Sequence, residues 1–152
     1  MAYISFDHVT KKYRMGEQEI YAARDVSFEI EKGEFCVIVG ASGAGKTTIL
    51  NILGGMDTLT SGKVFLDGNE ISAYNKKQLT GYRRYDVGFV FQFYNLVMNL
   101  NVSDNILLPQ TINGKRKSEL KKDLDEILEI TGLTEKRKAM PNTLSGGQQQ
   151  RV

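Results

Sequence analysis

The stretch IVGASGAGKTTIL, residues 38–50, places three glycines, one lysine and two adjacent threonines in an otherwise apolar run. Residues 40–47 match the pattern G-x-x-x-x-G-K-[ST]. An apolar strand that ends in glycines and continues as a helix leaves backbone N–H groups free at the helix N-terminus, beside the charge of Lys46. Phosphate is the anion that such donors bind most readily. The stretch therefore predicts a phosphate-binding loop between a strand and a helix, which opens a parallel α/β unit.

Each residue type in this loop has a task in binding a nucleoside triphosphate. The glycines let N–H groups converge on phosphate oxygens, Lys46 can reach the β and γ phosphates, and the Thr47 hydroxyl can bind Mg²⁺. Thr48 is expected to add a contact with the α phosphate. The alternative, a glycine-rich turn with an incidental lysine, leaves the complete motif unexplained. The predicted phosphate-binding residues are Gly40, Ser42, Gly43, Ala44, Gly45, Lys46, Thr47 and Thr48.

The composition is that of a globular domain and does not favour a nucleic-acid partner. The chain has 152 residues, of which 41% are hydrophobic and 25% charged, and its formal net charge is +2. Most proteins that bind phosphate backbones concentrate far more positive charge. The start of the chain has no apolar signal core, and no apolar run approaches the ~20 residues of a membrane helix. Cys36, the only cysteine, lies in an apolar run and predicts a small core residue in a reducing, cytoplasmic setting.

Two patterns of apolar residues predict strands. Alternation of apolar and polar residues predicts half-buried strands over residues 3–9 and 26–31, and the Asp67-Gly68 turn predicts a hairpin over residues 63–71. Continuously apolar runs at residues 35–39 and 87–91 predict strands covered on both faces. Antiparallel strands are therefore expected beside a parallel α/β core.

Helical patterns dominate the second half of the chain. Residues 76–84 predict a helix, and Gly132 ends an apolar stripe formed by Leu120, Leu124, Ile127, Leu128 and Leu133. Basic residues gather at 115–117, 121–122 and 136–138, but interleaved acidic residues predict a solvated surface. His8, the only histidine, predicts an exposed structural residue.

A second glycine motif, LSGGQ at residues 144–148, follows Pro141 and predicts a loop that opens another helix. It is a second anion site of bare backbone, and one triphosphate does not need two such loops from one chain. Two copies facing each other could place one loop of each around one nucleotide, which gives an isologous dimer.

With IVGASGAGKTT, GFVFQ and LSGGQQQRV in this order, the chain resembles the ATP-binding subunit of ABC transporters over essentially its whole length. It is most similar to the subfamily of macrolide exporters, lipoprotein-releasing complexes and antimicrobial-peptide resistance pumps. The resemblance implies an α/β fold, a P-loop NTPase (RecA-like) core with an antiparallel β subdomain and a helical subdomain. Residues 1–152 would form one nucleotide-binding domain, with 1–91 as β subdomain and P-loop core and 92–152 as helical subdomain.

The resemblance also implies roles for single residues. Gln92 would contact Mg²⁺ and the attacking water, and with Lys46 it is a predicted catalytic residue; otherwise it is a polar end to a strand. Tyr13 would stack on adenine, unless it only covers a sheet edge. Phe89, Phe91, Phe93 and Tyr94 are expected mostly in the core, although Phe93 and Tyr94, beyond Gln92, could instead help form the groove for a membrane partner. The γ phosphate of ATP held by the opposite subunit would be bound by Ser145, Gly146, Gly147 and Gln148.

The implied function is that of an ATPase with the cofactors ATP and Mg²⁺. Binding of ATP would close a head-to-tail dimer of two copies at the cytoplasmic face of the membrane. Hydrolysis would drive a permease that exports or extracts a hydrophobic or peptide substrate. Two alternatives remain open: a soluble ABC-type ATPase that acts on nucleic acid or ribosomes, and a nucleotide-binding fragment without hydrolytic activity.

Members of this family continue into an apolar strand that ends in Asp-Glu, and then to a switch histidine. The printed sequence ends at Val152, and its only Asp-Glu pair, Asp125-Glu126, lies in the predicted amphipathic helix. In proteins that this chain resembles, the strands that carry the glutamate and the histidine lie between the phosphate-loop strand and the strand that ends at Gln92. Without them, we expect the strands at 35–39 and 87–91 to lie roughly 14 Å apart, with an empty position between them. The expectation is therefore that either the protein continues beyond residue 152, or residues 1–152 alone are prone to aggregation and hydrolyse no ATP.

Overall fold

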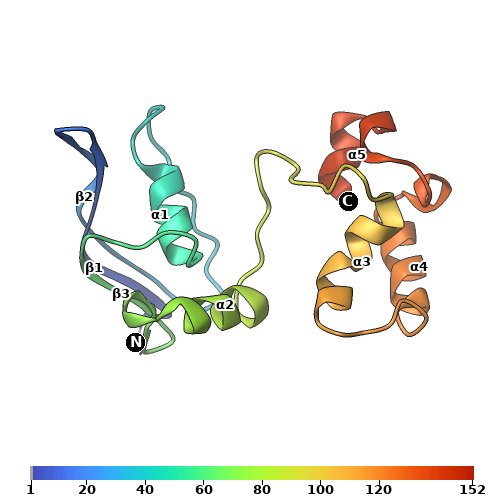
Figure 1. Ribbon diagram of the computed structural model, residues 1–152. Helices are drawn as coiled ribbons and strands as arrows, with labels where there is room; N and C mark the ends of the chain where they lie inside the picture. Colours follow the sequence, from blue (N-terminus) through green and yellow to red (C-terminus); the bar gives the residue numbers. More distant parts are fainter. Residues whose placement is uncertain (1) are drawn as a thin grey trace. The chain divides into compact units, whose positions relative to one another are not determined.

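The computed structural model describes residues 2–152, which form two compact units (Figure 1). The described part of the first unit runs from Ala2 to Phe89, and the second unit is Val90–Val152. Each unit has its own cluster of buried hydrophobic side chains. The units are therefore described one at a time.

The first unit is built on a four-stranded sheet. Its strands are β1 (Ile4–Met15), β2 (Gln18–Ile30), β3 (Ser61–Leu66) and β4 (Asn69–Glu70). They lie in the order β2-β1-β3-β4, and every pair is antiparallel. The predicted half-buried strands and the hairpin are confirmed, and β1 and β2 are longer than predicted. Asp67 and Gly68 both have positive φ, as the favoured two-residue hairpin turn requires.

The pairing of β1 with β2 is interrupted near His8 and Asp25. Both residues have positive φ, 49° and 52°, and the register shifts between Phe6 and Val9. Side chains support this irregularity, because the His8 N–H donates to Ser27 Oγ at 2.9 Å and His8 Nδ1 lies 2.6 Å from Asp25 Oδ1. His8 is exposed, as predicted.

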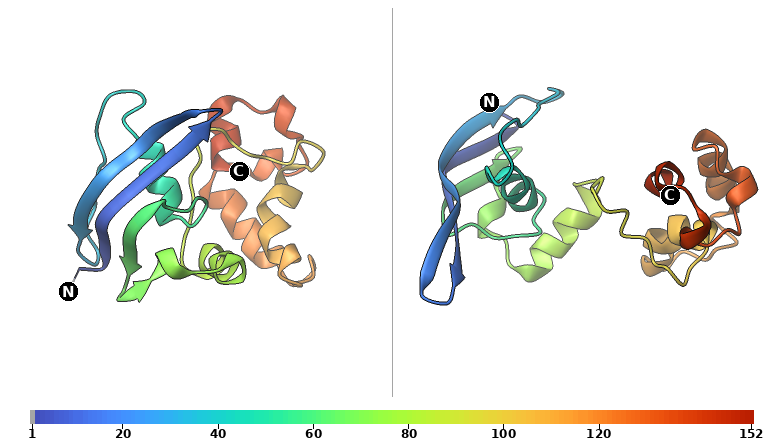
Figure 2. Two further views of the ribbon diagram at one scale, coloured as in Figure 1. Left: turned by 60° about the vertical axis from the view of Figure 1, so that its left-hand side comes forward. Right: turned by 90° about the horizontal axis from the view of Figure 1, so that it is seen from above.

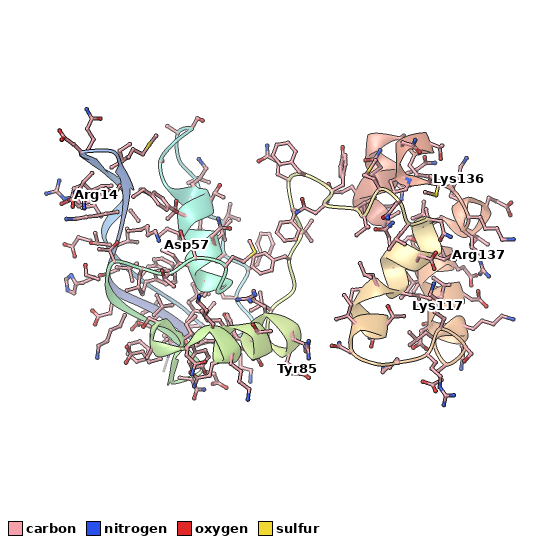
Figure 3. All side chains as sticks on the ribbon, viewed as in Figure 1. Arg14, Asp57, Tyr85, Lys117, Lys136 and Arg137 are labelled. Atoms are coloured by element: carbon pink, nitrogen blue, oxygen red, sulfur yellow. The ribbon has the colours of Figure 1, made fainter. Side chains whose placement is uncertain are left out.

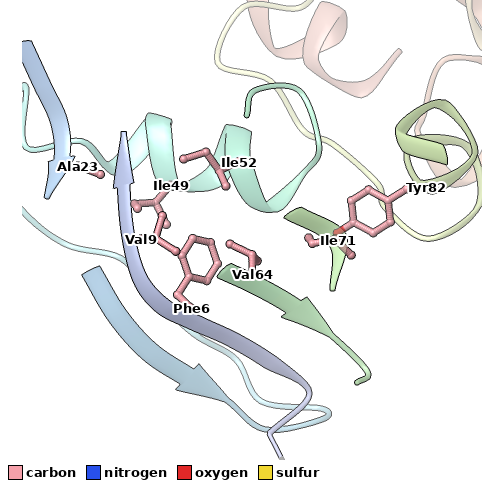
Figure 4. Packing of buried hydrophobic residues seen from close by; sticks show 8 residues of the cluster. All are labelled: Phe6, Val9, Ala23, Ile49, Ile52, Val64, Ile71 and Tyr82. Atoms are coloured by element: carbon pink, nitrogen blue, oxygen red, sulfur yellow. The ribbon is translucent and has the colours of Figure 1, made fainter. Parts of the chain in front are cut away.

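Helix α1 (Lys46–Leu53) packs against this sheet through Ile49 and Ile52 (Figure 4). Helix α2 (Lys76–Tyr85) follows the short 3₁₀ helix η1 (Ile71–Ala73) and begins with a capping box between Asn75 and Gln78. Both helices match the predicted segments. The buried cluster of the first unit consists of Phe6, Val9, Ala23, Ile49, Ile52, Val64, Ile71 and Tyr82.

The prediction of a buried strand at residues 35–39 is wrong for this structure. The segment belongs to no strand among the described residues, and Phe35 and Val39 are 91% and 83% exposed. Cys36 is exposed as well, so its assignment to the core is also wrong. A continuously apolar run indicates that a segment favours burial, but a strand also needs a hydrogen-bonded neighbour, and β1–β4 pair only with one another.

The second predicted buried strand, residues 87–91, is likewise not formed within the described residues. Val90 is 88% exposed and Phe93, just beyond this segment, is 77% exposed, so the aromatic run around Gln92 is not a core strand. Val87 and Phe89 are exceptions: Val87 packs against the core of the first unit, and the Phe89 ring occupies the space above Gly54 in which a Cβ atom would clash. The predicted separation of about 14 Å needs two strands and has no counterpart here.

The second unit is helical (Figure 2). Its helices are α3 (Val102–Ile112), α4 (Lys121–Ile130) and α5 (Gly146–Arg151), with 3₁₀ turns η2 (Thr134–Lys136) and η3 (Pro141–Thr143). The predicted stripe on α4 is buried except for Ile127, which is 39% exposed. Its core consists of Val102, Leu107, Leu120, Leu124, Leu128, Leu133 and Leu144.

The end of α4 follows the sequence prediction. Gly132 has φ +66°, its N–H donates to Glu129 O, and the next N–H, of Leu133, donates to Leu128 O at 2.8 Å. This is the Schellman arrangement that glycine favours at a helix end. The three basic clusters lie on the surface, and Arg137 pairs with Asp125 of α4 (Figure 3). In the part of the chain that the structure describes, no helix combines the length and apolar character needed to cross a membrane.

Candidate nucleotide-binding site

The phosphate loop ends at Gly45, directly before the first residue of α1. Gly45 has φ +86° and lies against β2, where a Cβ atom would come within 2.0 Å of Ala22 O. Only glycine therefore fits at this position. Within residues 2–152, no side chain caps α1 and no acidic residue lies in its first turn. The N–H groups and the positive end of the helix dipole are thus available to an anion.

Lys46 adds a positive charge to the same place. Its Nζ donates to Gly40 O at 2.9 Å and to Ala41 O at 2.7 Å, so the ammonium group is held over the loop. Beside it is a hollow of about 180 Å³, lined by Ala22 of β2 and by residues 43–48. A cation, a helix N-terminus and bare backbone around one hollow are the donor set that phosphate requires.

Tyr13 on β1 lies near this loop in the first unit. Its hydroxyl donates to Asp57 Oδ2 at 2.5 Å. This hydrogen bond, with burial and the charge of Asp57, raises the pKa of Tyr13 above its usual value, while contact with the Thr48 hydroxyl opposes the rise. Thr48 is thus near enough to act on the pKa of Tyr13, and Tyr13 as a whole residue is 40% exposed.

Two residues beside Tyr13 were not found from the sequence. Lys11 is only 8% exposed, and its Nζ donates to Asp57 Oδ1 and to Thr58 O, both at 2.6 Å. Burial acts to raise the pKa of Asp57, but hydrogen bonds from Lys11, Tyr13 and the Thr58 N–H, together with the Lys11 charge, outweigh it and lower that pKa. The only sequence signal was that Lys11 and Tyr13 are two residues apart on one strand, and this spacing places side chains on one face.

The second glycine motif starts α5 in the second unit, as predicted. Ser145 is its N-cap: Ser145 Oγ accepts from the Gln148 N–H at 3.3 Å, and Gln148 Oε1 accepts from the Ser145 N–H at 2.9 Å. A Cβ atom on Gly146 would lie 2.7 Å from the Tyr94 hydroxyl. The motif is therefore a capped helix start that Tyr94 packs against.

The three residues that follow this motif hold α5 in its unit. Gln149 Nε2 donates to Pro141 O and Leu144 O, Gln150 Nε2 donates to Phe91 O at 3.3 Å, and Arg151 Nε donates to Thr131 O at 3.0 Å. The sequence did not predict these contacts, because three successive polar residues on a helix do not indicate which of them face a neighbouring segment. Gln92 lies next to Phe91 in this second unit and is exposed. The loop at residues 40–48 belongs to the first unit, so the role of Gln92 beside it remains a prediction.

Thr47 is exposed at the start of α1. The described residues hold no group of three or more His, Cys, Asp or Glu side chains placed to bind a metal ion. In the first unit, the Thr47 hydroxyl and the oxygens of a bound nucleotide would be available to a metal ion. That donor set suits Mg²⁺, which keeps few protein ligands beside phosphates.

Together, the antiparallel sheet, the loop at the start of α1 and the helical second unit define the class of P-loop nucleotide-binding domains. A model of the ABC transporter family matches residues 23–152. The chain belongs to this family. The resemblance drawn from the sequence is thus confirmed.

Relatives come from several transport systems. An uncharacterized ABC transporter ATP-binding protein of Thermotoga maritima is 45% identical over 95% of this chain and 62% of its own length. The macrolide export ATP-binding/permease protein MacB of Mannheimia succiniciproducens is 41% identical over the whole chain, which spans 24% of MacB. The methionine import ATP-binding protein MetN 1 of Staphylococcus epidermidis is 38% identical over 98% of the chain and 43% of its own length.

Solved structures confirm the predicted fold class. The dimeric structure of MJ0796, a bacterial ABC transporter cassette, superposes with a TM-score of 0.88 at 41% identity. The match covers 97% of this chain and 66% of the MJ0796 chain. A second structure of MJ0796, in a post-hydrolysis state with ADP and Pi, gives the same TM-score at 40% identity.

Proposed function

We propose that the protein containing this chain is the ATP-binding subunit of an ABC transporter and hydrolyses ATP. The observation that supports this most directly is the phosphate loop, where Lys46 and the uncapped N-terminus of α1 surround one hollow. Family membership supports ATP as the ligand, and MJ0796 was solved with ADP and Pi. The residues that would bind the phosphates are Gly40, Ser42, Gly43, Ala44, Gly45, Lys46, Thr47 and Thr48.

Mg²⁺ would be bound by Thr47 and, in the complete site, by Gln92. The ion would neutralise charge on the β and γ phosphates, and Lys46 would share this task, so that both act mainly through electrostatics. Tyr13 would stack on the adenine base. Its partly exposed ring next to the Thr48 side chain supports this assignment.

A second copy would complete the site. Residues Ser145, Gly146, Gly147 and Gln148 would contact the γ phosphate of ATP held by the opposite subunit in a head-to-tail dimer. Support comes from the dimeric MJ0796 structure and from the glycine pair at the start of α5, because the N–H groups of Gly146 and Gly147 lie outside the capping box that Ser145 and Gln148 form. Residues 1–152 would belong to one nucleotide-binding domain, with 1–91 carrying the phosphate loop and 92–152 the helical part.

The partner would be an integral-membrane permease, which places the protein at the cytoplasmic face of the membrane. Phe93 and Tyr94 are exposed after Gln92 and would contribute to the contact. MacB, an export protein, and MetN 1, an import protein, are both relatives, so export of a hydrophobic or peptide substrate rests on the sequence resemblance. Co-purification of a permease from detergent extracts tests the partner, whereas recovery with ribosomes would favour the soluble alternative.

The replacement Lys46→Ala tests the nucleotide site itself. It removes the charge that the loop carbonyls hold, so binding of Mg·ATP should weaken at least about tenfold, since charge-assisted contacts are among the stronger polar interactions. Calorimetric titration and phosphate release measure the two effects. Lys63→Ala, which removes a half-exposed lysine on β3 of the same unit, is the matched control and should change neither. Unchanged ATP binding and turnover in Lys46→Ala would overturn the proposal.

A further inference from the structure

Lys11 is the one charged residue that is buried in the described part of the chain. A buried ammonium group is costly unless its hydrogen bonds and its charge are satisfied. Lys11 meets this requirement through Asp57 Oδ1 and Thr58 O, both 2.6 Å from Nζ. Nothing in the proposed reaction uses this lysine directly, so its burial calls for another explanation.

Asp57 joins this buried pair to Tyr13. It lies in the loop between α1 and β3 (Figure 3). One carboxylate oxygen, Oδ1, accepts from Lys11 and from the Thr58 N–H, and the other, Oδ2, accepts from the Tyr13 hydroxyl. Both oxygens are therefore engaged, which fixes the carboxylate and makes it a rigid acceptor for Tyr13.

The Tyr13 ring is held at two places. Its hydroxyl is bound by Asp57, and Lys11 Nζ lies over the ring, 4.8 Å from the centroid. The ammonium group is thus fixed beside one face by Asp57, and a cation in this position attracts the ring. Yet the residue remains 40% exposed. The ring is held in place while a substantial part of its surface stays open to a flat ligand.

We propose that Asp57, together with Lys11, is a positioning residue that holds the Tyr13 ring ready to stack on the base of the bound nucleotide. This inference rests on the proposed function, because it presumes that Tyr13 meets the base. Holding the ring in advance removes the cost of immobilising a side chain when the nucleotide binds. Asp57 follows the helix that begins at the phosphate loop, so the ring is tied to the same element as the phosphate site.

The experiment compares two ligands on the protein containing the complete chain: ATP, which has a base, and inorganic tripolyphosphate, which has none. Asp57→Asn removes the charge that holds Lys11, and Tyr13→Phe removes only the hydroxyl. Each should weaken ATP binding about 2- to 10-fold, the range expected for one side chain that must be immobilised on binding. Neither should change the affinity for tripolyphosphate. The double variant should bind ATP no more weakly than the single variants, because both act through one contact.

Asp25→Asn is the matched control, since Asp25 also pairs with a β1 side chain, His8, but does not contact Tyr13. It should leave the affinity for both ligands unchanged. If Asp57→Asn does not fold, Tyr13→Phe still tests the proposal, because it leaves the pairing of Lys11 with Asp57 intact.

Tyr13→Ala distinguishes base stacking by Tyr13 from the positioning of its ring by Asp57. It should weaken ATP binding roughly 5- to 100-fold, the usual worth of one base stacked on an aromatic ring, and spare tripolyphosphate. If it affects neither ligand or both alike, base stacking by Tyr13 is wrong. If it weakens ATP alone while Asp57→Asn and Tyr13→Phe leave ATP binding unchanged, only the positioning role is wrong. Equal weakening of both ligands by Asp57→Asn would also overturn that role, because it would show a general structural effect.

Discussion

At the scale of single residues, His8 and Asp25 show how a side-chain contact accompanies an unusual backbone. The hydrogen bond to Asp25, which accepts it, then the charge of Asp25 and that of Asp7, raise the pKa of His8 above its ordinary value. The protonated imidazole is therefore favoured in the folded protein. Its stabilising effect is complete below the unfolded pKa and is lost as the pH rises through the raised folded pKa. Because both side chains are largely exposed, the effect on stability is small.

Asp25→Asn should accordingly lower the pKa of His8 toward its ordinary value. Asp7→Asn removes a nearby charge without removing the hydrogen bond, so it should lower that pKa by less. The printed sequence has one histidine, which makes its imidazole signals easy to follow in an NMR titration. Equal shifts in both variants, or none, would contradict the contact with Asp25.

The same scale shows why the phosphate loop was predictable and its neighbours were not. Gly45 and Lys46 act through local backbone, so their spacing in the sequence is sufficient evidence. Lys11 and Asp57 are 46 residues apart, and a lysine in a strand predicts exposure rather than burial. Their pairing follows from the register of β1 beside the loop after α1, which a single sequence does not reveal.

At the scale of elements, α2 supports the end of α1. The Tyr82 hydroxyl donates to Leu53 O at 2.6 Å, and Arg83 donates to Gly55 O at 2.7 Å. The last carbonyl groups of a helix have no partner within it, so Tyr82 supplies one for Leu53, the last residue of α1, while Arg83 binds the turn just beyond the helix. Burial of the Tyr82 ring, then the charge of Asp86 and the nearby tyrosines, raises its pKa to about 12.

Tyr82→Phe should lower the free energy of unfolding by about 1–2 kcal/mol, because Leu53 O loses its donor. The raised pKa also sets a pH dependence: wild-type stability should fall as the pH rises from the ordinary tyrosine pKa near 10 toward 12. The variant should lose that part of the fall. Urea unfolding at neutral and alkaline pH measures both effects. Tyr85→Phe, at a 77% exposed position on the same helix, is the control and should behave as wild type.

Most elements were predictable because their signals are local. Alternation marked β1 and β2, the Asp67-Gly68 turn marked the hairpin, and Gly132 marked the end of α4. The strand expected at 35–39 was different, because the apolar run says only that the segment favours burial. Whether it pairs depends on a neighbouring strand, and the described residues offer none. Ile127 is a similar case within a helix. It belongs to the predicted apolar stripe but is partly exposed, because the apolar pattern does not show which residues another element covers.

At the scale of the whole molecule, the two units have separate cores, and each unit carries one of the two glycine motifs. The phosphate loop and Tyr13 belong to the first unit, and the glycine pair before α5 belongs to the second. The motifs could be predicted one by one, because each is a short local pattern. The arrangement of both motifs around one nucleotide is part of our proposal, and neither motif by itself could predict it, because a local pattern says nothing about contacts with a second copy.

The run at residues 35–39 is exposed except for the half-buried Ile38, so the reactivity of its cysteine can report on whether this segment is covered. Cys36 is the only cysteine of the printed sequence and lies in the middle of this run. In a polypeptide of residues 1–152, a thiol reagent should modify Cys36 nearly as fast as in the urea-unfolded chain. A rate far below that of the unfolded chain would contradict the exposed position. Any strand that pairs with residues 35–39 would shield the sulfur of Cys36 and slow its modification. The rate of modification would therefore show when such a pairing forms.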